Sequence, residues 1–347
     1  MNQTKYYVGI DISSETFTSA VGTVREKWEI VKKPETFSNE ISGLQKYLYW
    51  LQEEGAMANN SVVCMEATGV YGELLAHFLV ANKYTVSIEP PLKVKRAFHP
   101  EGHKSDPVDS KQISEYAYRF WDELSIWKPR KELIEQINTL LTVREQFVSE
   151  KTGHKNALQA LKRKVIRTPV AESIHESAIT NMNLNIKQIN EEIKKLINQD
   201  PDFRAMVQLL ITIPGVGITL ASYILVILQS GPESATARQL AAYIGICPYA
   251  CSSGTSIHKA ATSRHYGPSG VRRLLFLAAL SVRTHNPKYR EYFYRKQKEG
   301  KASKLIINNI ANNLLKVIIA VLRSNTPYIE NYQSINPGIL SLSLTRS

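Results

Sequence analysis

The first third of the chain alternates short apolar runs with helical patterns. A short apolar run over 6–12 and alternating residues over 16–24, joined by the polar Ser13-Ser14-Glu15, predict a β-hairpin. Apolar positions three and four residues apart predict a helix over 41–52. The other expected elements are, in order, a strand within 26–37, a strand over 61–65, a helix over 73–82, a strand over 85–88 and a helix over 92–98. This order predicts an α/β domain with a mixed sheet.

Two long helical patterns, 131–165 and 171–198, follow around a break at Thr168-Pro169. Long helices joined by a short link favour an antiparallel coiled-coil hairpin. Gly153 and the polar stretch 181–185 weaken the pattern, so we expect an interrupted arm that joins domains or pairs chains.

The rest of the chain reads as a mostly α-helical domain with a polar loop over 247–256. Its expected helices lie on both sides of Ile213-Pro214-Gly215-Val216-Gly217 and over 235–244, 271–284 and 302–323. The five-residue turn is typical either of a helix-hairpin-helix, whose backbone N–H groups approach a phosphate, or of an ordinary turn. We therefore expect domains over 1–130, 131–200 and 201–323, and a loosely held tail over 324–347.

Charge is spread unevenly along the chain. The net charge is +12, yet residues 1–130 carry −2, residues 131–200 carry +2, and residues 201–347 carry the whole excess of +12. Basic side chains that contact phosphates supply most non-specific affinity for nucleic acid. The last part therefore favours a nucleic-acid partner over a merely solvated basic face.

The sequence also argues against a membrane protein and against a disulfide-stabilised or zinc-binding protein. No apolar run approaches the roughly 20 residues that cross a bilayer, and residues 1–7 are polar, so we expect a cytoplasmic protein with no membrane partner. The three cysteines, Cys64, Cys247 and Cys251, are too few for a disulfide framework and lack the further ligands of a zinc site. We expect them to be reduced packing residues.

Acidic residues supply the first candidate site. In the stretch from Lys104 to Ser110, Ser105 can cap a helix whose first turn contains Pro107, which places Asp106 and Asp109 on one face. Such a pair suits a hard cation such as Mg²⁺, although an acidic first turn also complements the helix dipole without any ligand.

Two further acids stand at the ends of predicted strands, Asp11 near the end of the first strand and Glu66 after the strand over 61–65. Together with Asp106 and Asp109 they would make a ligand set for two Mg²⁺ or Mn²⁺ ions in phosphate displacement. A rival reading of residues 9–14 is the phosphate loop of sugar-kinase-like ATPases, which needs more glycine than this stretch offers.

A second candidate site is Ser252-Ser253-Gly254, which precedes a run of cations. A serine becomes a nucleophile only when a base or metal activates it, and Ser-Ser-Gly is also typical of a plain polar turn. Tyr243, Tyr249 and Tyr266 are rival nucleophiles. The side chains expected to bind nucleic acid are Lys104, Lys259, Arg264, Arg272 and Arg273.

Taken together, these residues resemble the DEDD transposases of bacterial insertion sequences, the group related to the Piv and MooV invertases. The resemblance covers nearly the whole chain and rests on the following motifs: Gly9-Ile10-Asp11, Glu66-Ala67-Thr68-Gly69, Lys104 to Asp109, residues 213–217, Tyr243-Ile244-Gly245, Pro248 and Ser253-Gly254. Ser110 departs from the small apolar residue expected there, and Asn312-Asn313 makes the last helix unusually polar.

The resemblance implies a RuvC-like, RNase H-like first domain whose acids bind divalent metal, and these carry over onto Asp11, Glu66, Asp106 and Asp109. It implies a serine that forms a phosphoserine link to DNA, which carries over onto Ser253. It further implies donor and target DNA, a structured RNA encoded in the element's non-coding ends, dimers or tetramers, and action at the nucleoid. The alternatives are a Holliday-junction-type nuclease that uses water, and a non-catalytic nucleic-acid-binding protein.

Overall fold

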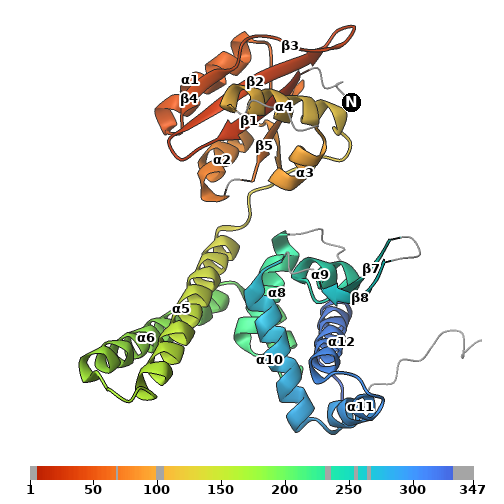
Figure 1. Cartoon of the computed structure of the whole chain (residues 1–347). Helices are drawn as coiled ribbons and strands as arrows, with labels where there is room; N and C mark the ends of the chain where they lie inside the picture. Colours follow the sequence, from red (N-terminus) through yellow and green to blue (C-terminus); the bar gives the residue numbers. More distant parts are fainter. Residues whose placement is uncertain are drawn as a thin grey trace, which may run out of the picture. The chain divides into compact units, whose positions relative to one another are not determined.

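The computed structural model describes residues 6–67, 69–98, 105–230, 236–253, 257–263 and 267–330, and only the backbone of 248–253 and 257–263. The chain forms two compact units, residues 1–129 and 130–347 (Figure 1). The finer division at residues 200 and 323 stays a prediction.

Unit 1 is built on a mixed sheet. The strand order is β3-β2-β1-β5-β6, and β4 also pairs with β2. β1 runs antiparallel to β2 and parallel to β5, which is parallel to β6. The strands are β1 (Tyr6–Ile12), β2 (Thr16–Val24), β3 (Trp28–Ile30), β4 (Glu35–Ser38), β5 (Ser61–Glu66) and β6 (Thr85–Glu89). The expected β1–β2 hairpin and mixed sheet are confirmed, while the single strand expected within 26–37 is wrong, because two short strands pair with different ends of β2.

Helices cover both faces of this sheet. Even-numbered residues of β1 pack with α1 (Ile41–Glu53) and α2 (Glu73–Ala81) around Leu44, Tyr47 and Leu75. Tyr7 of β1 and Val62 and Cys64 of β5 face the other way and pack with α3 (Pro91–Arg96) and α4 (Asp106–Arg119). Since successive side chains of a strand point to opposite faces, this division assigns every strand residue to one layer. The arrangement is consistent with an RNase H-like fold.

Unit 2 begins with α5 (Glu132–Lys162) and α6 (Pro169–Gln199), two paired helices of 31 residues each (Figure 1). The paired arm is confirmed, but the expected interruptions are wrong, because both helices run without a break. Gly153 is surrounded by open space. Its cost of roughly 1 kcal/mol relative to alanine is small compared with the stabilisation that the flanking helical turns provide.

The rest of unit 2 is helical around one core that also buries Ile134 and Leu141 of α5 and Ile193 of α6. Its helices are α7 (Pro201–Ile211), α8 (Ile218–Ser230), α9 (Ala237–Ile244), α10 (Ser269–His285), α11 (Pro287–Lys298) and α12 (Ser303–Ser324). By length and composition α12 could cross a membrane, but half of its apolar window is buried inside the protein, which is typical of a core helix. Asn313 of α12 is exposed, so the polar pair noted in the sequence borders the outer face.

Candidate active site

Asp11 and Glu66 are positioned by the pairing of two central strands. β1 and β5 run parallel with Ile10 opposite Met65, so the next residue of each strand is one of these acids. Both side chains follow the alternation of Tyr7 and Cys64, and therefore face the layer of α3 and α4. The two acids lie half-buried at the same carboxyl edge of the sheet.

The second pair of acids depends on how α4 packs on β1. A Cβ added to Gly9 would lie 2.1 Å from the Ser114 nitrogen and 2.2 Å from the Ser110 oxygen, so the helix backbone touches the strand. Ser114 is fully buried, and its Oγ donates a hydrogen bond of 2.6 Å to the Tyr7 carbonyl. Ser110 is also fully buried, which explains why a small side chain stands there.

These contacts set the direction of α4. Ser114 contacts both Tyr7 and Gly9, whereas Ser110, one turn earlier, contacts Gly9. Going toward the helix start therefore follows β1 toward Asp11, and the first turn with Asp106 and Asp109 lies at the edge that carries Asp11. Asp106 is exposed and Asp109 half-buried.

The start of α4 differs in one detail from the sequence prediction. Ser105 occupies the N-cap position, but its side chain makes no cap hydrogen bond. Its carbonyl instead accepts from the N–H groups of Val108 and Asp109, at 2.8 and 2.9 Å. Pro107 stands in the first turn as expected, because it needs no N–H partner there.

Carboxylate oxygens are the donors that Mg²⁺ and Mn²⁺ prefer, so the chemistry of the four acids fits such an ion. Their present spacing does not complete a site: within the part of the chain that the structure describes, no three His, Cys, Asp or Glu residues form a group that could hold a metal.

Glu89 is a neighbouring acid that the sequence reading missed. It stands opposite Glu66 in the β5–β6 register and is fully buried. Its carboxylate accepts hydrogen bonds from Ser87 Oγ at 2.9 Å, from the Ser125 N–H at 2.8 Å and from Lys93 Nζ at 3.0 Å. Burial has the largest single effect on the pKa of Lys93 and lowers it, but Glu89 and Tyr116 together raise the pKa of that ammonium above its ordinary value. The signal available in the sequence was an acid directly after the strand predicted over 85–88.

Cys64 lies close to this group of acids. Burial, and then the charges of Glu89 and Glu66, raise the pKa of its thiol far above the usual range. The residue is a free, fully buried cysteine, as the sequence suggested, and a neutral thiol in that place is a packing group.

Ser253 lies at the end of a strand in unit 2. β7 (Pro248–Ser253) pairs antiparallel with β8 (Ile257–Ser263), Ser253 opposite Ile257, and a register shift falls between Tyr249 and Cys251. The polar loop expected over 247–256 is therefore wrong for its first part. Pairing with β8 makes this part a strand despite its serines, and Gly254 to Ser256 lie outside the described residues.

Two of the five expected nucleic-acid-binding side chains have roles within the fold. Arg272 Nη1 donates to the carbonyls of Ile244 at 2.8 Å and Gly267 at 2.7 Å. Arg273 forms an ion pair of 2.6 Å with Glu145 of α5. The two arginines also line a cavity of about 340 Å³ with Ser269 and Asn308. Lys259 lies on β8 opposite Cys251, and Lys104 and Arg264 lie outside the described residues.

The turn between α7 and α8 separates its two glycines by role. Gly215 has a φ of +80°, and an added Cβ would lie 2.9 Å from the Ala278 oxygen of α10. Gly217 has open space around it. Gly215 is thus required by backbone conformation and packing, while only Gly217 fits the close approach of a ligand.

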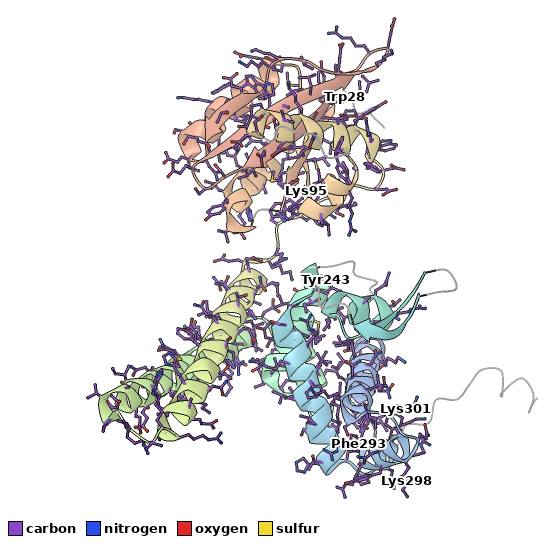
Figure 2. The ribbon with its side chains drawn as sticks, viewed as in Figure 1. Trp28, Lys95, Tyr243, Phe293, Lys298 and Lys301 are labelled. Carbon is purple, nitrogen blue, oxygen red and sulfur yellow. The ribbon has the colours of Figure 1, made fainter. Side chains whose placement is uncertain are left out.

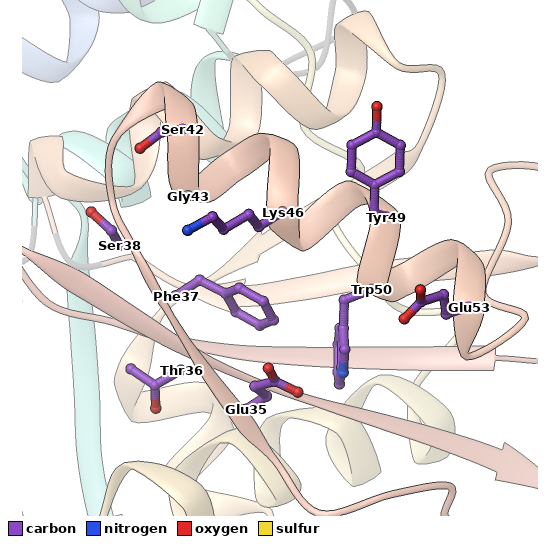
Figure 3. A pocket seen from close by; sticks show the side chains of 10 residues that line it. All are labelled: Glu35, Thr36, Phe37, Ser38, Ser42, Gly43, Lys46, Tyr49, Trp50 and Glu53. Carbon is purple, nitrogen blue, oxygen red and sulfur yellow. The ribbon is translucent and has the colours of Figure 1, made fainter.

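A groove of about 460 Å³ lies elsewhere in unit 1, between β4 and α1 (Figure 3). Phe37, Lys46 and Trp50 line it. Because α1 covers the face opposite α4, this groove is remote from the four acids.

Comparison with known proteins agrees with this arrangement. Residues 8–165 match the profile of a DEDD family described as "Transposase", and residues 207–294 match that of the "Transposase IS116/IS110/IS902 family". The chain belongs to the IS110 family of DEDD transposases.

The relatives of this IS110-family chain include pilin gene-inverting proteins. It is 29% identical over 327 residues to the pilin gene-inverting proteins of Moraxella lacunata and Moraxella bovis, covering 93% of this chain and 98% of theirs. It is 31% identical over 152 residues to an IS110 protein of Streptomyces coelicolor, covering 44% of this chain and 36% of that one.

The family membership fixes the class of chemistry. An IS110-family transposase is a DNA phosphoryl-transfer enzyme, so DNA is the substrate of this chain. The first matched segment contains Asp11, Glu66, Asp106 and Asp109, and the second contains Ser253. The sequence resemblance to this family is thereby confirmed.

Proposed function

We propose that the chain is a recombinase of a bacterial insertion sequence in which Asp11, Glu66, Asp106 and Asp109 hold Mg²⁺ or Mn²⁺. The observation that carries this proposal is the meeting of three elements at one edge. β1 and β5 end side by side with an acid each, and α4, held at Gly9, begins at the same edge with two more. When bound, the divalent ion supplies charge stabilisation for the pentavalent phosphate.

Ser253 is the proposed nucleophile. Its Oγ forms a bond to phosphorus, the P–O3′ bond breaks, and the DNA strand leaves with a free 3′ hydroxyl that takes the proton. The reverse reaction, with a 3′ hydroxyl attacking the phosphoserine, rejoins DNA and regenerates the serine. The position of Ser253 at the end of β7, where the strand pairing stops, supports this role.

The partners are donor and target DNA together with a non-coding RNA from the ends of the element. The basic excess of residues 201–347 supports contacts to nucleic-acid backbone, and delegating sequence choice to base pairing suits a protein that reads shape and charge. The paired helices α5 and α6 are the proposed element for assembly into dimers or tetramers.

The test is a covalent protein–DNA adduct that survives denaturation. The full chain is expressed with its flanking non-coding DNA and incubated with donor and target duplexes and Mg²⁺. Wild type is expected to form the adduct, while Ser253→Ala and Asp106→Ala lose it. Each variant has a matched control, Ser252→Ala for the neighbouring hydroxyl and Asp122→Ala for another exposed acid of unit 1.

Two outcomes would overturn parts of the proposal. If Ser253→Ala still nicks DNA in a Mg²⁺-dependent reaction, the nucleophile is water and a resolvase-type nuclease is the better description. If binding is salt-sensitive but no activity responds to Mg²⁺ or to Asp106→Ala, the acids are structural.

A further inference from the structure

α11 and the turn after it form a strongly basic segment of unit 2. Residues 283–304 contain eight Lys or Arg and two Glu, a net charge of +6, which is half of the excess of the whole chain. The sequence prediction missed this helix, although Asn286-Pro287 is a start signal and Tyr289, Tyr292, Phe293 and Lys296 have helical spacing.

The inner face of α11 fixes the helix to the domain. Phe293 is 3% exposed, and the guanidinium carbon of Arg283 lies 4.2 Å from the centre of its ring. Asn286 caps the first turn by accepting from the Tyr289 N–H, and Lys296 forms an ion pair of 2.8 Å with Glu299 at the end. The helix is therefore a firmly held platform.

The outer face of α11 carries exposed cations, one of which, Arg295, also lies 5.6 Å from the centre of the Tyr292 ring. Lys288, Arg295 and Lys298 are exposed, and beyond the helix so are Lys301 and Lys304. Figure 2 labels Lys298 and Lys301. Within the described ranges, the side chains of the four lysines of this set make no ion pair or hydrogen bond. Two acids lie among them: Glu291, three residues after Lys288 and four before Arg295, and Glu299, which is paired with Lys296. Such a concentration of unpaired positive charge attracts a polyanion.

We infer that the outer face of α11, with Lys301 and Lys304, binds the phosphate backbone of duplex DNA without reading its sequence. Lys288 and Lys298 are about 15 Å apart along the helix, which matches about four phosphates of one strand. The inference deepens the proposed function, on which it rests for its substrate, by naming a surface that holds DNA away from the reacting groups.

The chemistry of the two faces favours DNA over an anionic membrane. A helix that lies in a membrane interface presents a large apolar face to lipid. In α11 the apolar residues Phe293, Tyr289 and Tyr292 contact the core of unit 2, and Tyr294 is the one aromatic residue of this helix that is exposed. The face left for a partner is charged and suits phosphates.

The test measures binding of a labelled 30-base-pair duplex of scrambled sequence, in EDTA so that no cleavage contributes. The triple variant Lys288→Gln, Arg295→Gln, Lys298→Gln is expected to bind at least about tenfold more weakly than wild type in low salt, and the slope of log K against log salt should shrink by about three. All three residues are exposed, and circular dichroism checks that the fold is kept.

A charge-matched control carries Lys27→Gln, Lys33→Gln and Arg25→Gln on exposed positions of unit 1, and it should bind like wild type. Equal affinity and slope in the triple variant and this control would overturn the inference. The inference would also be overturned if the same residues were required for binding to vesicles of phosphatidylglycerol, or to an RNA hairpin of equal charge, but not for binding to DNA. If α11 binds DNA as inferred but no adduct forms with Mg²⁺, the proposed chemistry is wrong while the DNA-binding surface stands.

Discussion

α4 and α11 begin alike and are held in the fold in opposite ways. Each has a proline in its first turn, Pro107 and Pro287. α4 lies with its backbone against β1, where Gly9, Ser110 and Ser114 leave no space for a larger side chain. α11 is anchored chiefly by one buried aromatic residue and keeps a charged face toward solvent.

The difference suits the roles proposed for the two helices. Carboxylates that share an ion must be placed within fractions of an ångström, so a helix proposed to carry two of them needs the fixed position that backbone contact gives α4. Attraction of a polyanion depends on charge density and tolerates displacements of several ångströms. Small buried residues are therefore characteristic of α4, and exposed lysines are characteristic of α11.

The largest effect is expected from Gly9→Ala. The added methyl group would overlap the backbone of both Ser110 and Ser114, and neither can move without lifting α4 from the sheet. We expect a loss of more than about 4 kcal/mol in the free energy of unfolding, together with loss of Mg²⁺-dependent activity. Urea denaturation followed by circular dichroism measures the first.

Gly153→Ala is the matched control for that substitution. The glycine lies within α5 with open space around it, so the methyl group should stabilise the protein by about 0.5–1 kcal/mol. If the two variants had similar stability, the close contact between α4 and β1 would be wrong.

An intermediate effect is expected from Glu89→Gln, beside Glu66. The substitution removes the charge that pairs with Lys93 in a fully buried position, and we expect a cost of about 3 kcal/mol in stability at neutral pH. Because the pair raises the pKa of Lys93, its contribution is complete below the ordinary lysine pKa and is lost as the pH rises through the folded-state value. The difference between variant and wild type should shrink at strongly alkaline pH.

Glu135→Gln tests whether burial is the cause. Its partner is Arg130, and the two side chains are 41% and 36% exposed, so the same chemical change should cost less than about 1 kcal/mol. Equal losses of stability in the two variants would mean that burial of Glu89 does not increase the cost of removing its charge.

The sequence predicted the layers of unit 1 well because strand alternation and helical spacing are local signals. The hairpin of β1 and β2, the strand that ends at Glu66 and the start of α4 near Asp106 all follow from residues close in the chain. The partners of Glu89 could not be predicted from the sequence, because Ser125 lies 36 residues away and only the fold brings its N–H to that carboxylate.

In unit 2 the prediction from the sequence was wrong where a loop pattern and a pairing partner favoured different structures. The segment 247–256 is rich in Ser and Gly, which favour loops, yet pairing with β8 makes part of it a strand. α11 was hidden by its charge, since only one of its residues is fully buried. The family motifs still single out Ser253 as the proposed nucleophile, because a motif depends on residue order and not on secondary structure.

The smallest effect, and the sharpest test of the α11 surface, is expected from Glu291→Gln. Glu291 is the acid among the outer cations of this exposed helix, and its removal should tighten binding of the scrambled duplex about twofold, the size of an exposed charge pair of roughly 0.5 kcal/mol. Stability should change by less than about 0.5 kcal/mol, because the side chain is exposed. Glu26→Gln makes the same change of net charge in unit 1 and should leave DNA binding unaltered. An equal gain in both variants would mean that DNA responds to total charge and not to α11, whereas a gain confined to Glu291→Gln places the duplex against this helix.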